Sequence, residues 1–248
     1  MSATILETRG LTCAFGGLIA VDHVDFALSE AEIRAVIGPN GAGKTTLFNL
    51  ITGVLAPTSG QILFRGEDIT GLPVHQISQK GIARTVQVTS IFPTLSVTDN
   101  VWLGAQSRRR LQPLARRSRM PAIRQEVEEI IALVGLQAQA EAEAAELSHG
   151  DQRLLEMALA LSTRPLLLLL DEPTAGLSAK ETHDMVQVVK ELAKRQTIII
   201  VEHDMDVVME LADIISVLHL GKMLAEGTPQ AIRENTLVQE VYLGSAAC

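Results

Sequence analysis

The sequence is poor in aromatic residues, cysteine and positive charge. Among its 248 residues, 3% are aromatic and 47% are hydrophobic, so a core must be built mainly from aliphatic side chains. The two cysteines, Cys13 and Cys248, stand in neither a metal-binding nor a redox spacing, which suits a reducing compartment. The net charge of -8 argues against a nucleic-acid-binding protein, because phosphate contacts require a basic face.

Long hydrophobic runs are also missing. The longest apolar run covers residues 166–170, far short of the roughly 20 residues that span a bilayer. The N-terminus lacks the basic-then-apolar pattern of a signal segment. We therefore expect a cytosolic protein that serves a membrane only from outside the lipid. One local basic cluster is interpreted as a solvated surface, with anionic lipid headgroups as the alternative; it comprises Arg108, Arg109, Arg110, Arg116, Arg117 and Arg119.

Apolar segments alternate with helical patterns through much of the chain. Continuous apolar runs, typical of parallel strands covered on both faces, lie at residues 32–37, 166–170 and 197–201. Helical patterns follow or precede them at residues 45–52, 152–162 and 179–195. The sequence therefore predicts a layered α/β core.

Other segments predict a second kind of structure. Residues 4–28, 60–65 and 214–226 alternate apolar and polar, which predicts antiparallel strands, with a hairpin turn near residues 220–222. Residues 93–145 have no convincing strand pattern. We expect them to form a mostly helical subdomain, inserted into the α/β core and containing a basic linker at residues 107–121.

A phosphate-binding loop is predicted between the first apolar strand and the first helix. The spacing G-x-x-x-x-G-K-[ST] is met by Gly38, Pro39, Asn40, Gly41, Ala42, Gly43, Lys44 and Thr45. Glycines let backbone N–H groups turn towards phosphate oxygens, and the following helix points its positive end at the same anion. Lys44 is expected at the β- and γ-phosphates and Thr45 at Mg²⁺. An ordinary glycine turn is the alternative.

Two further strands end in polar residues. Asp171 and Glu172 follow the run at residues 166–170, and His203 follows the run at residues 197–201. A carboxylate at the end of a buried strand can bind Mg²⁺, and the next carboxylate can activate water. Taken alone, the acidic pair is a helix cap or turn and the histidine is structural. Together with the loop, they favour a nucleotide site at the carboxyl edge of a sheet.

In this order, the elements resemble the nucleotide-binding subunit of an ABC transporter over nearly the whole chain. The resemblance implies a P-loop NTPase cassette that binds ATP and Mg²⁺ and hydrolyses ATP. Residues 38–46, which add Thr46 to the loop, resemble Walker A, and Asp171 resembles the Walker B aspartate. Glu172, His203 and Gln87 resemble the catalytic glutamate, the switch histidine and the Q-loop glutamine that touches Mg²⁺. Phe15 resembles the aromatic residue that stacks on adenine.

The stretch LSHGDQ at residues 147–152 resembles the signature usually written LSGGQ. In that family the signature of one subunit covers the γ-phosphate held by the other subunit. Ser148 and Gly150, at the start of a helix with unpaired N–H groups, suit such an anion site. His149 replaces a glycine and Asp151 replaces a glutamine. We interpret Asp151 as a local helix cap, since Ser148-x-x-Asp151 has capping-box spacing; a direct role at the site is the alternative. Ser178 also replaces a common aspartate.

Shorter stretches narrow the resemblance. Residues 14–21, 201–205, 227–229 and 242–244 resemble the branched-chain amino acid importer group. Urea or short-chain amide importers and aromatic-acid importers are the alternatives. The implied partners are a second ATPase subunit (self or a paralogue), two membrane-spanning permease subunits and an extracytoplasmic solute-binding protein. The expected location is the cytoplasmic face of the inner membrane.

We expect one nucleotide-binding domain over residues 1–248. Residues 1–92 and 146–248 would form the β subdomain and RecA-like core, and about 93–145 the helical subdomain. Four apolar residues in the loop after Gln87 are expected either to line a groove for the permease or to pack the helical subdomain: Ile91, Phe92, Leu95 and Val97. A soluble ABC ATPase of translation or DNA repair and a small P-loop kinase are the rival functions.

Overall fold

The computed structural model describes residues 3–85, 91–107 and 121–244. The chain forms two compact units, and the first combines Met1–Lys80 with Ala193–Cys248 while the second is Gly81–Leu192. Each unit has its own buried aliphatic residues, as the composition predicts. Cys13 is buried, and Cys248 lies outside the described residues, as do Gln87 and the arginine cluster of residues 108–119.

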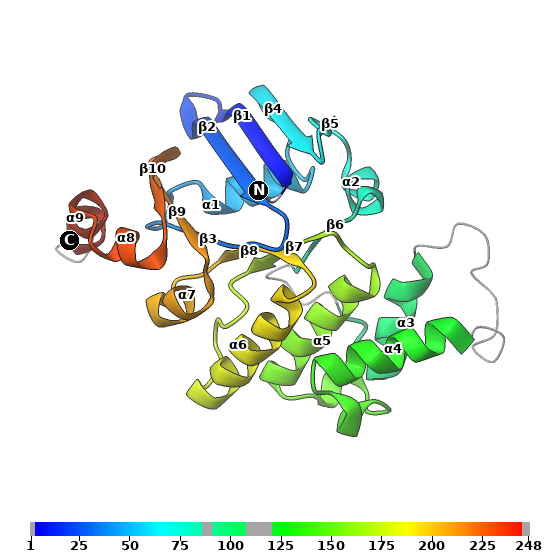
Figure 1. Ribbon diagram of the computed structural model, residues 1–248. Helices are drawn as coiled ribbons and strands as arrows, with labels where there is room; N and C mark the ends of the chain where they lie inside the picture. Colours follow the sequence, from blue (N-terminus) through cyan, green and yellow to red (C-terminus); the bar gives the residue numbers. More distant parts are fainter. Residues whose placement is uncertain (1–2, 86–90, 108–120, 245–248) are drawn as a thin grey trace. The chain divides into compact units, whose positions relative to one another are not determined.

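One sheet of the first unit is antiparallel (Figure 1). Its strands lie in the order β2-β1-β4-β5, with bounds β1 Thr4–Phe15, β2 Leu18–Ser29, β4 Ser59–Phe64 and β5 Glu67–Asp68. The long β1 pairs with both β2 and β4. Buried and exposed residues alternate along much of β2, as expected for a strand with one face on a core. This confirms the predicted antiparallel segment near the N-terminus.

The other sheet of this unit contains parallel strands. β3 (Ile33–Ile37) pairs in parallel with β8 (Thr197–Val201) and with β9 (Ile214–His219). β10 (Lys222–Gly227) pairs antiparallel with β9 at the edge. Every residue of β3 and β8 is buried, which explains their continuous apolar sequence. The helices of this unit are α1 Lys44–Ile51, α2 Val74–Lys80, α7 Met205–Leu211, α8 Pro229–Arg233 and α9 Thr236–Gly244.

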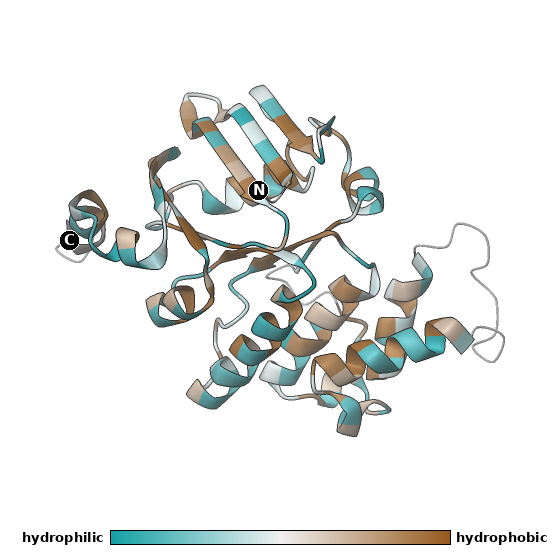
Figure 2. Cartoon of the chain, in the orientation of Figure 1, coloured by the Kyte–Doolittle hydropathy of each residue, from teal (hydrophilic) through white to brown (hydrophobic). Residues whose placement is uncertain are grey.

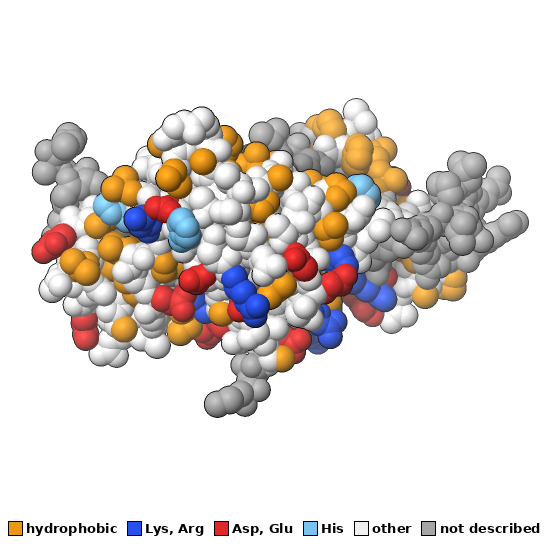
Figure 3. Space-filling model, turned by 90° about the horizontal axis from the view of Figure 1, so that it is seen from above, with side chains coloured by type: hydrophobic (Ala, Val, Ile, Leu, Met, Phe, Trp, Pro, Cys, Tyr) orange, Lys and Arg blue, Asp and Glu red, His pale blue; other side chains and the backbone are white. Residues whose placement is uncertain are grey.

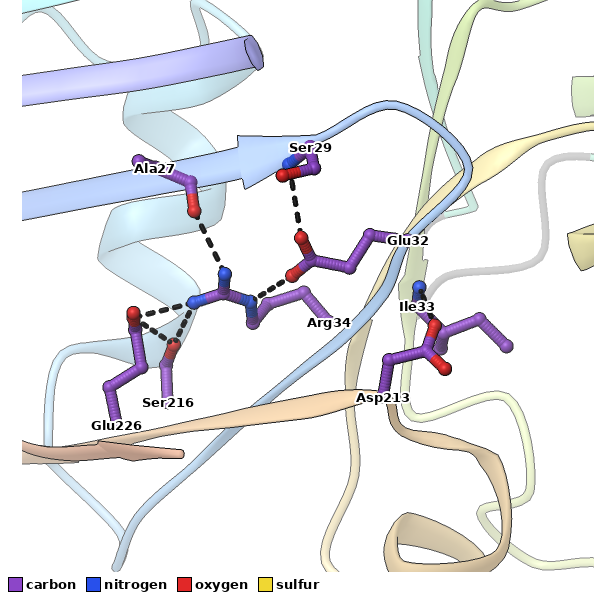
Figure 4. A network of polar contacts seen from close by, with 8 residues as sticks. All are labelled: Ala27, Ser29, Glu32, Ile33, Arg34, Asp213, Ser216 and Glu226. Atoms are coloured by element: carbon purple, nitrogen blue, oxygen red, sulfur yellow. Dashed lines mark hydrogen bonds and ion pairs between the residues drawn. The ribbon is translucent and has the colours of Figure 1, made fainter. Parts of the chain in front are cut away.

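A buried arginine joins the two sheets of the first unit (Figure 4). Arg34 of β3, with a side chain only 5% exposed, donates to Glu32 Oε1 at 2.6 Å and to the Ala27 carbonyl of β2 at 2.8 Å. Its third nitrogen donates to Ser216 at 3.0 Å and pairs with Glu226. Since a buried guanidinium must satisfy all its N–H groups, this network fixes how β2, β3, β9 and β10 approach one another.

The second unit contains a short parallel pair and most of the helices. β6 (Ile82–Arg84) pairs in register with β7 (Leu167–Asp171), for example Ile82 with Leu167. The helices are α3 Val97–Ser107, α4 Pro121–Leu133, α5 His149–Ser162 and α6 Ala179–Ala193, with short 3₁₀ turns η2 Gln137–Gln139 and η3 Ala144–Glu146. Hydrophilic and hydrophobic residues alternate around α4 and α6 (Figure 2), as expected for helices that bury one face.

The elements follow the predicted order with shifted bounds. α5 begins at His149, before the predicted start at residue 152, because Ser148 caps the helix. The predicted helical stretch 93–145 lies within the second unit, and one isolated bridge joins Ser96 and Glu143 there. Within the described ranges, no helix combines the length and hydropathy needed to cross a membrane. On the face shown in Figure 3, acidic and basic side chains are interspersed rather than gathered by sign.

Candidate nucleotide-binding site

The predicted phosphate loop connects β3 to α1, as the motif requires. Its glycines adopt conformations that other residues rarely reach: φ is +153° at Gly38, +78° at Gly41 and +104° at Gly43. A Cβ on Gly38 would lie 2.1 Å from the Leu218 carbonyl oxygen, and one on Gly43 would lie 2.4 Å from the Ala20 carbonyl oxygen. Only glycine fits at these two positions. The loop is thus shaped by close backbone approach on both sides.

The start of α1 is open to an anion. Gly43 is its N-cap and supplies no side-chain hydrogen bond to the first turn. The first N–H groups of a helix lack intrahelical partners, and the helix dipole favours negative charge there. Thr45 is exposed and Thr46 is half-buried at this helix start. The geometry suits a phosphate group.

Lys44 is folded back onto the loop. Its Nζ donates to the carbonyl oxygens of Gly38 at 2.6 Å and Pro39 at 3.1 Å, and the residue is only 7% exposed. These carbonyl groups hold the ammonium at the centre of the loop. A phosphate accepts from the same donor, so the lysine is positioned for the role that the motif predicts.

The surroundings of the loop belong to the same unit. The amide of Gly221, in the β9–β10 turn, donates to the Ala42 carbonyl at 3.0 Å, and the amide of Asp22 in β2 donates to the Gly221 carbonyl at 2.8 Å. A hollow of about 500 Å³ is lined by loop residues 39–42, by the β9–β10 turn and by α9. Phe15 ends β1 with 49% of its surface exposed, so its ring remains available for stacking.

His203 lies at the same sheet edge as the loop. β8 is parallel to β3 with Val36 opposite Val201, so the strand that leads to His203 and the strand that leads to Gly38 end on the same side. The His203 side chain is exposed, and its amide donates to the buried Glu202 carboxylate at 2.9 Å. The first unit therefore brings the loop and this histidine to one edge, as the sequence predicts.

In the second unit, the candidate metal ligand ends β7. Asp171 accepts from Arg84 Nη2 at 2.6 Å, and the exposed fractions of the two side chains are 0% and 11%. The amide of Asp171 donates to Thr85 Oγ1 at 3.3 Å. Asp171 Oδ1 is buried and has no hydrogen-bond partner among the described residues. An uncompensated buried carboxylate oxygen is costly, which makes Oδ1 a candidate ligand atom.

Glu172 follows in a strained backbone conformation. Its φ of +50° lies in the left-handed region, which costs a non-glycine residue on the order of 1–3 kcal/mol and occurs preferentially at functional sites. The side chain is half-buried. This outlier supports the assignment of Glu172 as a functional residue rather than as part of an ordinary turn.

Each unit contains an oxygen donor of the kind that Mg²⁺ prefers. Thr45 of the first unit offers a hydroxyl oxygen, and Asp171 of the second unit offers a carboxylate oxygen. Within residues 3–85, 91–107 and 121–244, no group of three or more His, Cys, Asp or Glu side chains could hold a metal ion. Mg²⁺ is usually bound through one or two carboxylates together with substrate phosphates.

The signature turn is a capped helix start. Ser148 is the N-cap of α5, and its Oγ accepts from the Asp151 amide at 3.1 Å. The Asp151 carboxylate accepts from the Ser148 hydroxyl and from Gln139 Nε2, each at 2.9 Å. The interpretation of Asp151 as part of a local helix cap is confirmed. Its carboxylate binds the capping hydroxyl rather than the N-cap amide of a standard capping box.

Two contacts at this site have weak or no sequence signal. The ion pair of Arg84 with Asp171 joins residues 87 positions apart, and nothing in the spacing predicts it. Glu181 packs against Gly150, and only its capping-box spacing to Ser178 could have identified it. Of the two alternatives for the loop after Gln87, packing holds for Val97, which is fully buried at the start of α3. Phe92, by contrast, is 49% exposed.

Comparison with known proteins gives consistent matches. The ABC transporter family model matches residues 21–175, and a model described as branched-chain amino acid ATP-binding cassette transporter matches residues 222–248. The chain is 42% identical to the high-affinity branched-chain amino acid transport ATP-binding protein BraF of Pseudomonas aeruginosa, over 99% of this chain and 100% of the relative. It is 40% identical to LivG of Escherichia coli, a protein of the same description, with the same coverage.

Solved structures agree with the sequence matches. An ATP-binding cassette of an ABC transporter in its ADP conformation superposes with a TM-score of 0.85 and 29% identity, covering 97% of this chain and 99% of that one. A nucleotide-free cassette gives 0.84 and 29%, covering 96% and 98%. The predicted fold class is confirmed.

Proposed function

Because this chain belongs to the ABC transporter family of ATP-hydrolysing cassettes, we propose that it is the ATPase subunit of an importer for branched-chain or other hydrophobic amino acids. The observation that carries the proposal is the identity of 40–42% over the full length of relatives described as branched-chain amino acid transport ATP-binding proteins. The match at residues 222–248 supports it independently. A urea, short-chain amide or aromatic-acid importer would use the same cassette with other membrane subunits.

Each site residue of the cassette has its own role in ATP binding and hydrolysis. Lys44 and the N–H groups at the start of α1 bind the β- and γ-phosphates, and Phe15 stacks on adenine. Glu172 accepts a proton from the attacking water, and His203 and Gln87 orient the γ-phosphate region. Asp171, Thr45 and Gln87 would hold Mg²⁺, which neutralises phosphate charge when it is bound.

Two cassettes complete the site. Ser148 and Gly150 of one subunit would bind the γ-phosphate held by the loop of the other, so that each subunit lends half of the pocket. The second cassette is a copy of this chain or a paralogue. Binding of ATP closes the pair, and hydrolysis removes the phosphate that joins the two halves.

The remaining partners lie at the membrane. Two permease subunits would receive the motion of the pair at the cytoplasmic face, and an extracytoplasmic binding protein would deliver the solute. The exposed ring of Phe92, with Ile91 and Leu95, is the part of the post-Gln87 loop that we retain for contact with the permease. We also retain residues 93–145 as a helical subdomain of a single nucleotide-binding domain.

A pair of variants tests the ATPase assignment. Glu172→Gln should bind ATP without turning it over, and should therefore accumulate an ATP-bound dimer on gel filtration. Lys44→Ala should lose nucleotide binding, measured with a fluorescent ATP analogue, because the ammonium at the centre of the loop is removed. Unchanged turnover in Glu172→Gln would refute its role as the base.

The cargo requires a separate experiment. The transporter should be purified with its permease and binding protein, and the solute bound to the binding protein identified by mass spectrometry. A branched-chain or other hydrophobic amino acid supports the proposal. If the bound solute is urea or an aromatic acid, the proposed amino-acid cargo is wrong. Co-purification with ribosomes or DNA instead of membrane subunits would refute the transport function.

A further inference from the structure

The two donors of the signature turn are already engaged within the chain. The Ser148 hydroxyl donates to the Asp151 carboxylate at 2.9 Å. Gly150 is buried, and a Cβ placed on it would lie 2.6 Å from Glu181 Oε1 and 2.9 Å from Glu181 Cδ. The turn proposed to bind a γ-phosphate thus faces two carboxylates of its own chain.

Glu181 connects two segments of the second unit. It lies in the first turn of α6, and its Oε2 accepts from the Ser178 amide at 2.9 Å and the Ser178 hydroxyl at 2.6 Å. Its other oxygen lies against Gly150 at the start of α5. One carboxylate therefore joins the loop of residues 175–178 to the signature turn.

The carboxylate carries its charge at neutral pH. Hydrogen bonds from the Ser178 hydroxyl and the Ser178 amide lower the pKa of Glu181, and a hydrogen bond from the Gly150 amide and the proximity of His149 act in the same direction. An ionised carboxylate at a helix N-terminus satisfies the same N–H groups and dipole that attract a phosphate.

We propose that Glu181 is a positioning residue of the nucleotide sandwich: it holds the signature turn against the loop of residues 175–178 in the lone protomer and yields the Gly150 amide to the γ-phosphate when the partner binds. The inference rests on the proposed pairing of two cassettes. Glu181 lies outside the LSHGDQ stretch, and its charge would set how strongly ATP drives the pairing of the two cassettes. Because one N–H cannot fully satisfy two anions, the charge of Glu181 opposes closure.

A capping box alone would make a different prediction. Ser178-x-x-Glu181 has the capping-box spacing, and a glutamine serves at the last position of that box as well as a glutamate. Glu181→Gln therefore keeps the cap and removes the charge. Ser178→Ala is the matched control, since it removes the capping hydroxyl and keeps the charge.

Both variants should be made in the Glu172→Gln background, and dimer formation should be followed by sedimentation velocity during ATP titration. Glu181→Gln should pair about two- to fivefold more tightly than its parent, the range expected for removing one competing charge at a helix start. Ser178→Ala should not tighten pairing. Equal or weaker pairing in Glu181→Gln would overturn the inference and leave Glu181 as a helix cap.

A second measurement does not depend on pairing. Hydrogen–deuterium exchange of peptides covering residues 147–152, without nucleotide, should be faster in Glu181→Ala than in the parent, while peptides of α4 remain unchanged. Unchanged exchange would overturn the contact itself. A parent that never pairs with ATP would instead refute the proposed sandwich, so the two failures are distinguishable.

Discussion

Breaking the buried ion pair between Arg84 and Asp171 should lower the stability of the second unit. The two charged groups are in contact at 2.6 Å, and neither side chain exceeds 11% exposure. Two unit charges about 4 Å apart interact by about 4 kcal/mol at an effective dielectric constant of about 20. Removing one partner of a buried pair costs about 3–5 kcal/mol, because the other charge stays buried and uncompensated. Arg84→Met should therefore lower the free energy of unfolding by about 3–5 kcal/mol.

The chain offers a direct assay and a control. Its single tryptophan, Trp102, is buried in α3 of the same unit, so fluorescence during urea denaturation in EDTA reports on this unit. Arg124→Met removes an exposed pair with Glu128, whose side chains are 72% and 61% exposed. Such surface pairs contribute about 0–1 kcal/mol.

A double variant tests whether Arg84 and Asp171 are energetically coupled. Arg84→Met combined with Asp171→Asn leaves no buried charge at the pair, so it should recover most of the stability that Arg84→Met loses. Strictly additive losses, or a loss in Arg84→Met no larger than that in Arg124→Met, would show that the pair is not coupled as its geometry indicates.

Three further predictions concern Arg34, Phe15 and Asp151. Arg34→Met should lower the melting temperature by several degrees or more, measured by calorimetry, because its network joins the two sheets of the first unit and breaking a buried pair costs about 3–5 kcal/mol; a shift near zero would contradict this role. Phe15→Ala should raise the Kd for a fluorescent ATP analogue by about tenfold, since loss of stacking costs about 1–3 kcal/mol, whereas Phe15→Tyr should retain the affinity. Asp151→Gln should change ATP-driven dimerisation by less than about tenfold, because the Asp151 carboxylate binds the capping Ser148 hydroxyl and Gln139 within its own chain, and a hundredfold change by sedimentation would assign it a direct role.

Local sequence patterns predicted the frame of this protein well. The continuous apolar runs became β3, β7 and β8, since such runs are stable only between two covered faces. The phosphate loop was predictable because its glycines, lysine and threonine lie within eight consecutive residues at a fixed spacing. The start of a helix differs from the predicted one where a capping residue sets it, as Ser148 does for α5.

Contacts between distant residues were not predictable in the same way. In the sequence, nothing distinguishes Arg84 from other polar residues of a short segment. Only the parallel pairing of β6 with β7 brings it to Asp171. Val97 could not be distinguished from its exposed neighbour Phe92 by composition, because both are apolar; their burial is decided by packing of α3. Pairing and packing, rather than periodicity, fix these positions.

The departures from the usual signature form one connected group in the fold. His149 stands where the family has a glycine, and its Nε2 lies 3.4 Å from the Cβ position of Gly176, so the ring packs on the loop that carries Ser178. Ser178 in turn donates to Glu181, which lies against Gly150. A serine can donate to that carboxylate, whereas the aspartate found in many relatives would repel it. The serine and the histidine therefore suit a signature turn that Glu181 braces, and exchanging Ser178 for aspartate should loosen that brace before the partner arrives.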